Sequence, residues 1–247
     1  MNSIVTTPPA KSLFNKLVLV TLAVFCCFGA LKAYNFGTAN LAFYRAHQIV
    51  EYWQEQQKVS SDADYQIALD SMLDATQKHP NNPQYLITLG LVYEWGGLQA
   101  TSQNKSAEPY FRQAEKAYLT AVHYRPTWPG TWATLAILKW RLGEIDDAMI
   151  SYLQLADKFG ENTPQVHSAW VDLGFLLYKT KSPFIANVIN GVRKHLASML
   201  ANPKTTSEAI DIAKRHGAER LACSWAMSSN KLTEDRKEAV CRILASG

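Results

Sequence analysis

The sequence lacks the residue patterns of the common catalytic and metal-binding sites. It has only four cysteines, and none of its six histidines stands three or four residues from another. The motifs H-E-x-x-H, C-x-x-C and G-x-S-x-G and a glycine-rich phosphate loop are all absent. Acidic pairs such as Asp146-Asp147 stand at expected helix starts, where the helix dipole accounts for them. We therefore expect a protein without enzymatic activity, cofactor or metal ion.

Charged residues are also few, at 19% of the chain, and the formal net charge is only +4. Ten lysines and arginines against six acidic residues between 190 and 247 account for the whole surplus. Nucleic-acid binding needs a concentrated cationic face, so this balance argues against a nucleic-acid partner. A hydrophobic content of 47% indicates a folded chain, and no run of alternating β-branched residues predicts a strand.

One long apolar run stands near the N-terminus. Leu17 to Leu31 contains no charged residue, and Lys16 and Lys32 bracket it. A helix over 13–36 would be about 36 Å long, enough to cross the hydrocarbon core of a membrane. We expect a cytosolic lead at 1–12 and a transmembrane anchor at 13–36. A cleaved secretory signal peptide is the alternative, although cleavage after Ala33 would place the large Leu31 three residues before the cut.

The charges beside this run set its expected orientation. Lys11, Lys16 and the α-amino group precede it, whereas Lys32 and Arg45 follow it. This small bias places the N-terminus in the cytosol. We therefore expect a single-pass protein of the inner membrane, with the rest of the chain in the periplasm or an equivalent outside compartment.

The remaining chain is predicted to form a series of helices. A juxtamembrane helix within 37–60 is expected to continue from the anchor. Later helix starts carry a capping residue, often followed by proline, and the expected stops carry glycine. The starts are Ser61, Asn82-Pro83, Thr163-Pro164, Ser182-Pro183 and Ser207-Glu208, and the stops are Gly96-Gly97 and Gly143.

A recurring spacing of small and large residues indicates that these helices form repeats. Ala114, Tyr118, Ala121 and Pro126 recur 34 residues later as Ala148, Tyr152, Leu155 and Gly160. The same spacing occurs 46 residues earlier, at Ala68, Met72, Ala75 and Pro80. The difference implies an insertion of about twelve residues at about 95–106, which we expect to bulge between the two helices of one repeat.

This pattern resembles the tetratricopeptide repeat (TPR), a helix-turn-helix unit of about 34 residues. The resemblance implies an all-α fold. It would consist of an N-terminal transmembrane helix, a TPR-like right-handed helical solenoid at 61–201, and C-terminal capping helices at 202–247. Lys139 departs from the pattern, because its position is usually aromatic or aliphatic.

The TPR resemblance also implies where a partner would bind. In such solenoids the concave face is formed mainly by the first helix of each repeat. Its positions here are mostly apolar and lack the polar set that clamps a terminal carboxylate in chaperone-binding relatives. We expect a protein partner's helix or the chain's own C-terminal helices to fill this groove. Its candidate residues are Ile87, Leu91, Glu94, Ile137, Trp140, Val171, Phe175 and Tyr178.

A second resemblance covers nearly the whole chain. The short lead, the single span, the helix ANLAFYRAHQIVEYWQEQ and the segment PQYLITLGLVYEW are similar to the VpsP family of exopolysaccharide-biosynthesis accessory proteins. This resemblance implies a scaffold that assists polysaccharide synthesis or export at the inner membrane. The alternatives are an anchored periplasmic TPR protein that assists chaperones at the translocon, and a structural scaffold of another envelope complex.

Cysteines Cys223 and Cys241 are the only two outside the expected anchor, which contains Cys26 and Cys27. They fall on two expected helices, at about 218–228 and 233–245, which a short turn makes antiparallel neighbours. An oxidising compartment would favour a disulfide between them, worth about 3 kcal/mol on the chain-entropy model. Two separately buried thiols are the alternative.

Overall fold

The computed structural model describes residues 10–246, with side chains described from Phe14 onward. This part of the chain folds into eleven α-helices and contains no strand. The fold is an all-α, TPR-like helical solenoid preceded by one long apolar helix, as the sequence predicts. The helices are α1 Ala10–Gln56, α2 Asp62–Lys78, α3 Pro83–Ser102, α4 Glu108–Tyr124, α5 Pro129–Arg141, α6 Asp147–Gly160, α7 Pro164–Lys179, α8 Ile185–Ala201, α9 Pro203–His216, α10 Glu219–Met227 and α11 Glu234–Ala245.

These helices divide into two compact units. The first unit ends at Leu89 and the second begins at Gly90, so helix α3 crosses the boundary between them. The first unit contains α1 and α2, and the second contains α4 to α11.

The first unit is built on the C-terminal half of α1, which packs along α2. The buried residues of α1 recur every three or four positions and form one stripe, at Ala39, Phe43, Ala46, Val50 and Trp53. Helix α2 packs against this stripe with small or flexible side chains at Ala68, Met72 and Ala75, so the two helices can approach closely. The juxtamembrane segment is therefore the first helix of a helix pair, whereas the sequence pattern had supplied only its second helix.

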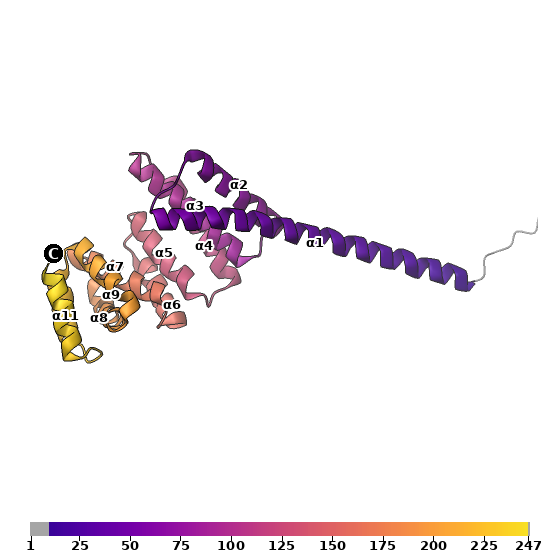
Figure 1. Ribbon diagram of the computed structural model, residues 1–247. Coiled ribbons are helices and arrows are strands. Elements are labelled where there is room, and N and C mark those ends of the chain that lie inside the picture. The colour runs from indigo at the N-terminus through magenta and orange to yellow at the C-terminus, as the bar shows by residue number, and fades with distance from the viewer. Residues whose placement is uncertain (1–9, 247) are drawn as a thin grey trace, which may run out of the picture. The chain divides into compact units, whose positions relative to one another are not determined.

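The N-terminal half of α1 is exposed and apolar. Its large hydrophobic residues from Phe14 to Phe36 are mostly more than half exposed, and the helix is long and apolar enough to cross a membrane. Figure 1 shows this half of α1 extending as a rod beyond α2. No break separates it from the half that packs on α2, because α1 is continuous from Ala10 to Gln56.

The expected helix ends are partly confirmed. Ser61 caps α2, its hydroxyl accepting a hydrogen bond from the Asp64 amide at 3.0 Å, and Gly143 adopts a φ of +75° after α5. The start expected at Ser207-Glu208 is wrong, because α9 already begins at Pro203. Asn202 caps it, accepting a hydrogen bond from the Lys204 amide at 3.0 Å, and a capping asparagine followed by proline is a stronger start signal.

The stop expected at Gly96-Gly97 is also wrong, since α3 continues to Ser102. The inserted residues mostly lengthen this helix rather than form a bulge, and only residues 103–107 are outside helices. The reason for glycine at 97 is close packing. A Cβ atom there would lie 2.3 Å from Cε1 of Phe111 on α4. Gly90 likewise leaves room for the ring of Tyr118, 2.6 Å from where its Cβ would be.

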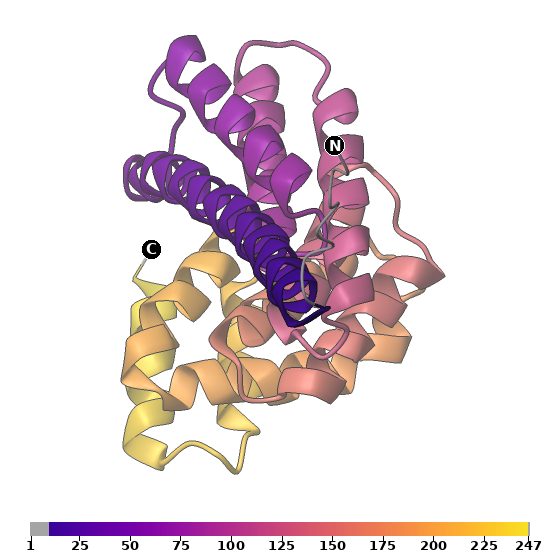
Figure 2. The ribbon, with the colours of Figure 1, turned by 90° about the vertical axis from the view of Figure 1, so that its right-hand side faces the viewer.

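The second unit contains the helix pairs α5–α6 and α7–α8. Trp132 and Tyr152 lie in one packed pair, with ring centroids 5.7 Å apart, as the repeat spacing predicts. Glycines again permit close contact between helices α7 and α8, since Gly191 faces the Trp170 ring. Helices α9 to α11 then cover the end of the array, and Figure 2 shows the orange and yellow ribbons of α8 to α11 side by side.

Candidate partner-binding groove

The structure exposes only part of the predicted groove. Tyr178 is 49% exposed, Ile87, Leu91, Ile137 and Trp140 are half-buried, and Glu94, Val171 and Phe175 are buried. Ile87 belongs to the first unit and the other seven residues to the second. The buried three residues are therefore not surfaces for a partner in this structure, and each has a partner within the second unit instead.

Glu94 belongs to a buried polar network. The Tyr118 hydroxyl donates a hydrogen bond to Glu94 Oε1 at 2.5 Å, and Arg141 pairs with Oε2. Burial raises the pKa of the Glu94 carboxyl, while the charge of Arg141 and the hydrogen bond from Tyr118 act in the opposite direction. Burial, together with the charge of Glu94, raises the pKa of Tyr118 well above its ordinary value. This network links α3, α4 and α5 and serves packing.

The groove positions on α7 are filled by the chain's own C-terminal helices. Trp225 of α10 stacks on Phe175, with centroids 5.8 Å apart, and meets Tyr178 edge-on at 6.4 Å. The guanidinium of Arg193 lies 5.3 Å from the Trp225 ring. Asp172, which is also on α7, contacts α9. Its Oδ1 atom lies 2.5 Å from Nε2 of His216. Helices α9 and α10 thus occupy this part of the groove, which the sequence had left open between an internal and an external occupant.

Lys139, which departs from the repeat pattern, is held by acidic residues at the α5–α6 turn. Its ammonium lies 2.8 Å from Asp146 Oδ2 and also pairs with Glu144. Arg112 of α4 pairs with the same Glu144. Hydrogen bonds from Arg112 and Lys139 lower the pKa of Glu144 to about 2. Lys139 therefore joins α5 to the turn that starts α6, and Glu144 connects this turn to Arg112 of α4.

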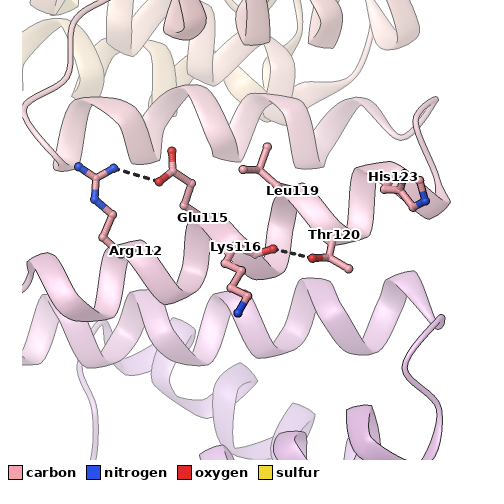
Figure 3. A pocket seen from close by; sticks show the side chains of 6 residues that line it. All are labelled: Arg112, Glu115, Lys116, Leu119, Thr120 and His123. Carbon is pink, nitrogen blue, oxygen red and sulfur yellow. Dashed lines mark hydrogen bonds and ion pairs between the residues drawn. The ribbon is translucent and has the colours of Figure 1, made fainter.

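A shallow open pocket of about 510 Å³ lies along the exposed face of α4 (Figure 3). Its lining comes from α4 alone, and Figure 3 shows Arg112 bonded to Glu115. That hydrogen bond is 3.0 Å long, and the other end of the guanidinium holds Glu144. Its arginine is thus already paired, so the pocket does not offer a free guanidinium to an anionic ligand. The lining residues are Arg112, Glu115, Lys116, Leu119, Thr120 and His123.

Cys223 and Cys241 form a disulfide between α10 and α11, with Cα atoms 5.0 Å apart. The connection between these helices, Ser228 to Thr233, is longer than the four-residue turn expected from the sequence. It lets the two cysteines reach the same level although they stand at different distances from the turn. The bridge closes a loop with a sequence separation of 18 residues.

We expect reduction of this disulfide to destabilise the α10–α11 hairpin by about 3 kcal/mol, because the reduced chain regains loop entropy when it unfolds. The measurement is hydrogen exchange of α10 and α11 in oxidised protein and in Cys223→Ser/Cys241→Ser. Cys26→Ser/Cys27→Ser is the matched control, since both residues lie in the exposed apolar half of α1. Two free thiols at 223 and 241 in protein purified without reductant would contradict the bridge.

Sequence analysis missed one cluster, the contact between His167 of α7 and His195 of α8. The two residues are 28 positions apart, so no motif joins them. Each nevertheless stands within the buried stripe of its helix, where histidine is unusual, and this position is the feature that could have drawn attention to the two residues.

Within residues 10–246, no three His, Cys, Asp or Glu side chains are arranged to hold a metal ion.

Comparisons with known proteins assign no family to this chain. The sequence matches no protein-family model and no curated protein. Among solved structures it is similar to the human IFIT1 dimer with PPP-AAAA, with 17% identity and a TM-score of 0.45. That match covers 77% of this chain and 46% of the other, so this chain spans less than half the length of the protein it resembles.

Proposed function

We propose that this protein is a membrane-anchored, non-enzymatic scaffold that holds a protein partner near the membrane surface. The observation that carries the proposal is the continuity of α1. One uninterrupted helix contains an exposed apolar half, long enough to cross a bilayer, and a half that packs into the first helix pair of a TPR-like array. A rigid connection of this kind would fix the first helix pair at the membrane.

In this proposal, the partner contacts the groove residues of the second unit that are not buried. Leu91, Ile137 and Trp140 are half-buried and Tyr178 is exposed, which leaves an apolar and aromatic surface. Aromatic residues are enriched at the centres of protein interfaces. A protein helix suits such a surface better than a polyanion does, because none of these four side chains is cationic.

The finer proposal is that the scaffold serves exopolysaccharide synthesis or export at the inner membrane, with α2 to α11 in the periplasm. The resemblance to the VpsP family supports it, together with the positive charges that precede the apolar half of α1. The partners would then be glycosyltransferase, polymerase or export components.

Membrane attachment is tested by placing charge in the apolar half of α1. We expect Val20→Arg/Val24→Arg to shift the protein from the carbonate-washed membrane pellet to the soluble fraction, or to prevent its accumulation. Each arginine costs about 2.5–3.5 kcal/mol at the centre of a membrane-spanning helix. Leu41→Arg is the matched control, because Leu41 is 72% exposed on the same helix but lies beyond the expected span. Equal membrane retention of both variants would contradict an anchor.

The partner is tested by photo-crosslinking in intact cells. A crosslinker at Tyr178 should capture polysaccharide-assembly components, whereas one at Leu119, which is 39% exposed on α4, should not. Capture of translocon subunits or chaperones would support the alternative scaffold. Unchanged polysaccharide output in a deletion strain would contradict the exopolysaccharide role and leave the anchored scaffold standing.

A further inference from the structure

Two buried histidines face each other where α7 meets α8. Nδ1 of His167 lies 2.7 Å from Nδ1 of His195, and the two side chains are 8% and 0% exposed. The His195 ring also stacks on Trp170, with centroids 5.1 Å apart and planes at 20°. The scaffold function described above uses neither histidine. Buried histidines in direct contact need an explanation of their own.

The geometry of the contact limits how many protons the pair can carry. A hydrogen bond between two imidazole nitrogens needs a proton on one of them and a lone pair on the other. A charged imidazole carries a proton on both of its nitrogens. If both rings were charged, two N–H groups would therefore point at each other across 2.7 Å. The doubly protonated pair is incompatible with this contact, so the rings would have to separate.

The surrounding charges do not offset a buried positive charge well. Asp157 of α6 lies 3.1 Å from His195 Nε2, but it already pairs with Lys194 of α8 at 3.0 Å. Glu161, also near the end of α6, pairs with the same lysine at 3.3 Å and is 59% exposed. From the α10–α11 connection, the positive charge of Lys231 acts on His167. Two carboxylates, both already paired with Lys194, thus act on the histidines together with the two lysines.

Burial lowers the pKa of both rings, while the surrounding charges act in both directions. Burial lowers the pKa of His195 to about 4, a shift that Asp157 opposes and that Lys194 and His167 reinforce. Burial, followed by Lys231 and Lys194, also lowers the pKa of His167. An unfolded histidine has a pKa near 6.5, so below that pH the unfolded chain binds protons that the folded pair does not. Stability from this contact is therefore present at neutral pH and is lost as the pH falls below about 6.5.

We propose that His167 and His195 form an acid-sensitive latch, which holds α7 against α8 at neutral pH and loosens that helix pair in acid. Helix α7 also carries Phe175 and Tyr178, on which Trp225 packs. Loosening α7 would therefore act on the part of the groove that the C-terminal helices fill. The latch depends on contacts within the second unit alone and does not require the membrane or partner assignments.

The test is hydrogen exchange of the full-length protein in detergent micelles at pH 7.5 and pH 5.0, corrected for the intrinsic effect of pH. In the wild type we expect protection of α7 and α8 to fall by about tenfold or more at pH 5.0. The reason is that a difference of one pKa unit between the folded and unfolded states changes the folding equilibrium by a factor of about ten. His195→Gln keeps an acceptor for His167 but cannot become charged, so it should lose most of this acid effect. His123→Gln, on the exposed face of α4, is the matched control and should behave as the wild type.

A second measurement uses the wild type alone and does not depend on how a variant folds. Histidine-selective NMR should show that the His195 ring remains neutral at pH 5.5 and shares a hydrogen bond with His167. This result, with a fall in α7 and α8 protection on further acidification, would support the latch. All histidine rings titrating near pH 6.5, or an equal loss of protection in His195→Gln and wild type, would overturn it.

Discussion

Replacing Arg141 with methionine should destabilise the second unit by about 3–5 kcal/mol, which is the usual cost of leaving a buried charge without its partner. Arg141 is the cation that pairs with Glu94, whose side chain is only 6% exposed. Methionine keeps much of the packing volume of arginine but none of its charge. The variant would therefore leave the Glu94 carboxylate with a hydrogen bond from the Tyr118 hydroxyl but without a positive charge beside it.

The loss in Arg141→Met should depend on pH. Burial already raises the pKa of Glu94, and removing Arg141 takes away the largest effect that opposes this rise. An acid whose pKa is higher in the folded than in the unfolded state weakens the fold at high pH and recovers as it gains a proton. Chemical denaturation should therefore show a larger difference from wild type at pH 8 than at pH 5.

Two further variants separate charge from packing. Glu94→Gln/Arg141→Met removes both charges and keeps an acceptor for Tyr118, so it should recover most of the lost stability. Arg112→Met, which removes an arginine whose side chain is 42% exposed, should cost far less stability, because solvent screens an exposed ion pair. An Arg141→Met variant that matches Arg112→Met in stability at pH 8 would show that the Glu94 network carries no buried charge.

The sequence predicted the repeat architecture because that architecture depends on local periodicity. Small residues such as Ala114 and Ala121 are buried where helices pack, and capping residues such as Ser61 mark helix starts. Both signals are read within one or two helical turns. The helix order, the absence of strands within residues 10–246 and the pairing of Trp132 with Tyr152 follow from them.

The wrong helix ends show where local signals fail. Gly97 has the composition of a helix stop, yet its role is to admit the Phe111 ring from the next helix. The packing of α3 on α4 therefore outweighs the low helix propensity of glycine. The first helix of the first pair lacks a separate signal for a related reason. Its buried stripe from Ala39 to Trp53 lies in the same helix as the apolar segment, so the sequence alone predicts a juxtamembrane helix and not the first helix of a pair.

The residues that cover α7 could not be predicted from the sequence. The repeat pattern predicts that Phe175 and Val171 face a groove, whereas the structure buries both side chains. Whether a chain fills its own groove depends on residues some fifty positions away, here Trp225. The same limit applies to His167 and His195, which meet across two helices. Contacts of this kind leave no periodic trace in the sequence.

Trp225 provides the strongest test of this self-filled groove. We expect Trp225→Ala to destabilise the packing of α10 on α7 by about 3–5 kcal/mol, the usual cost of truncating a buried tryptophan. Trp225 is 6% exposed and contacts Phe175, Tyr178 and Arg193. Removing it would leave Phe175, which is fully buried in the wild type, facing a cavity or solvent.

The expected result is a selective loss of hydrogen-exchange protection in α9 to α11 and in the C-terminal half of α7, because local openings draw on the contacts of one region. Helices α5 and α6, which pair with each other, should keep most of their protection. Met227→Ala is the matched control on the same helix, since Met227 is 45% exposed and such surface changes usually stay within about 0.5 kcal/mol. If Trp225→Ala and Met227→Ala left α7 equally protected, α10 would not be what covers the groove. If Trp225→Ala instead increased crosslinking of a partner at Tyr178, the internal occupant and the partner would compete for the same surface.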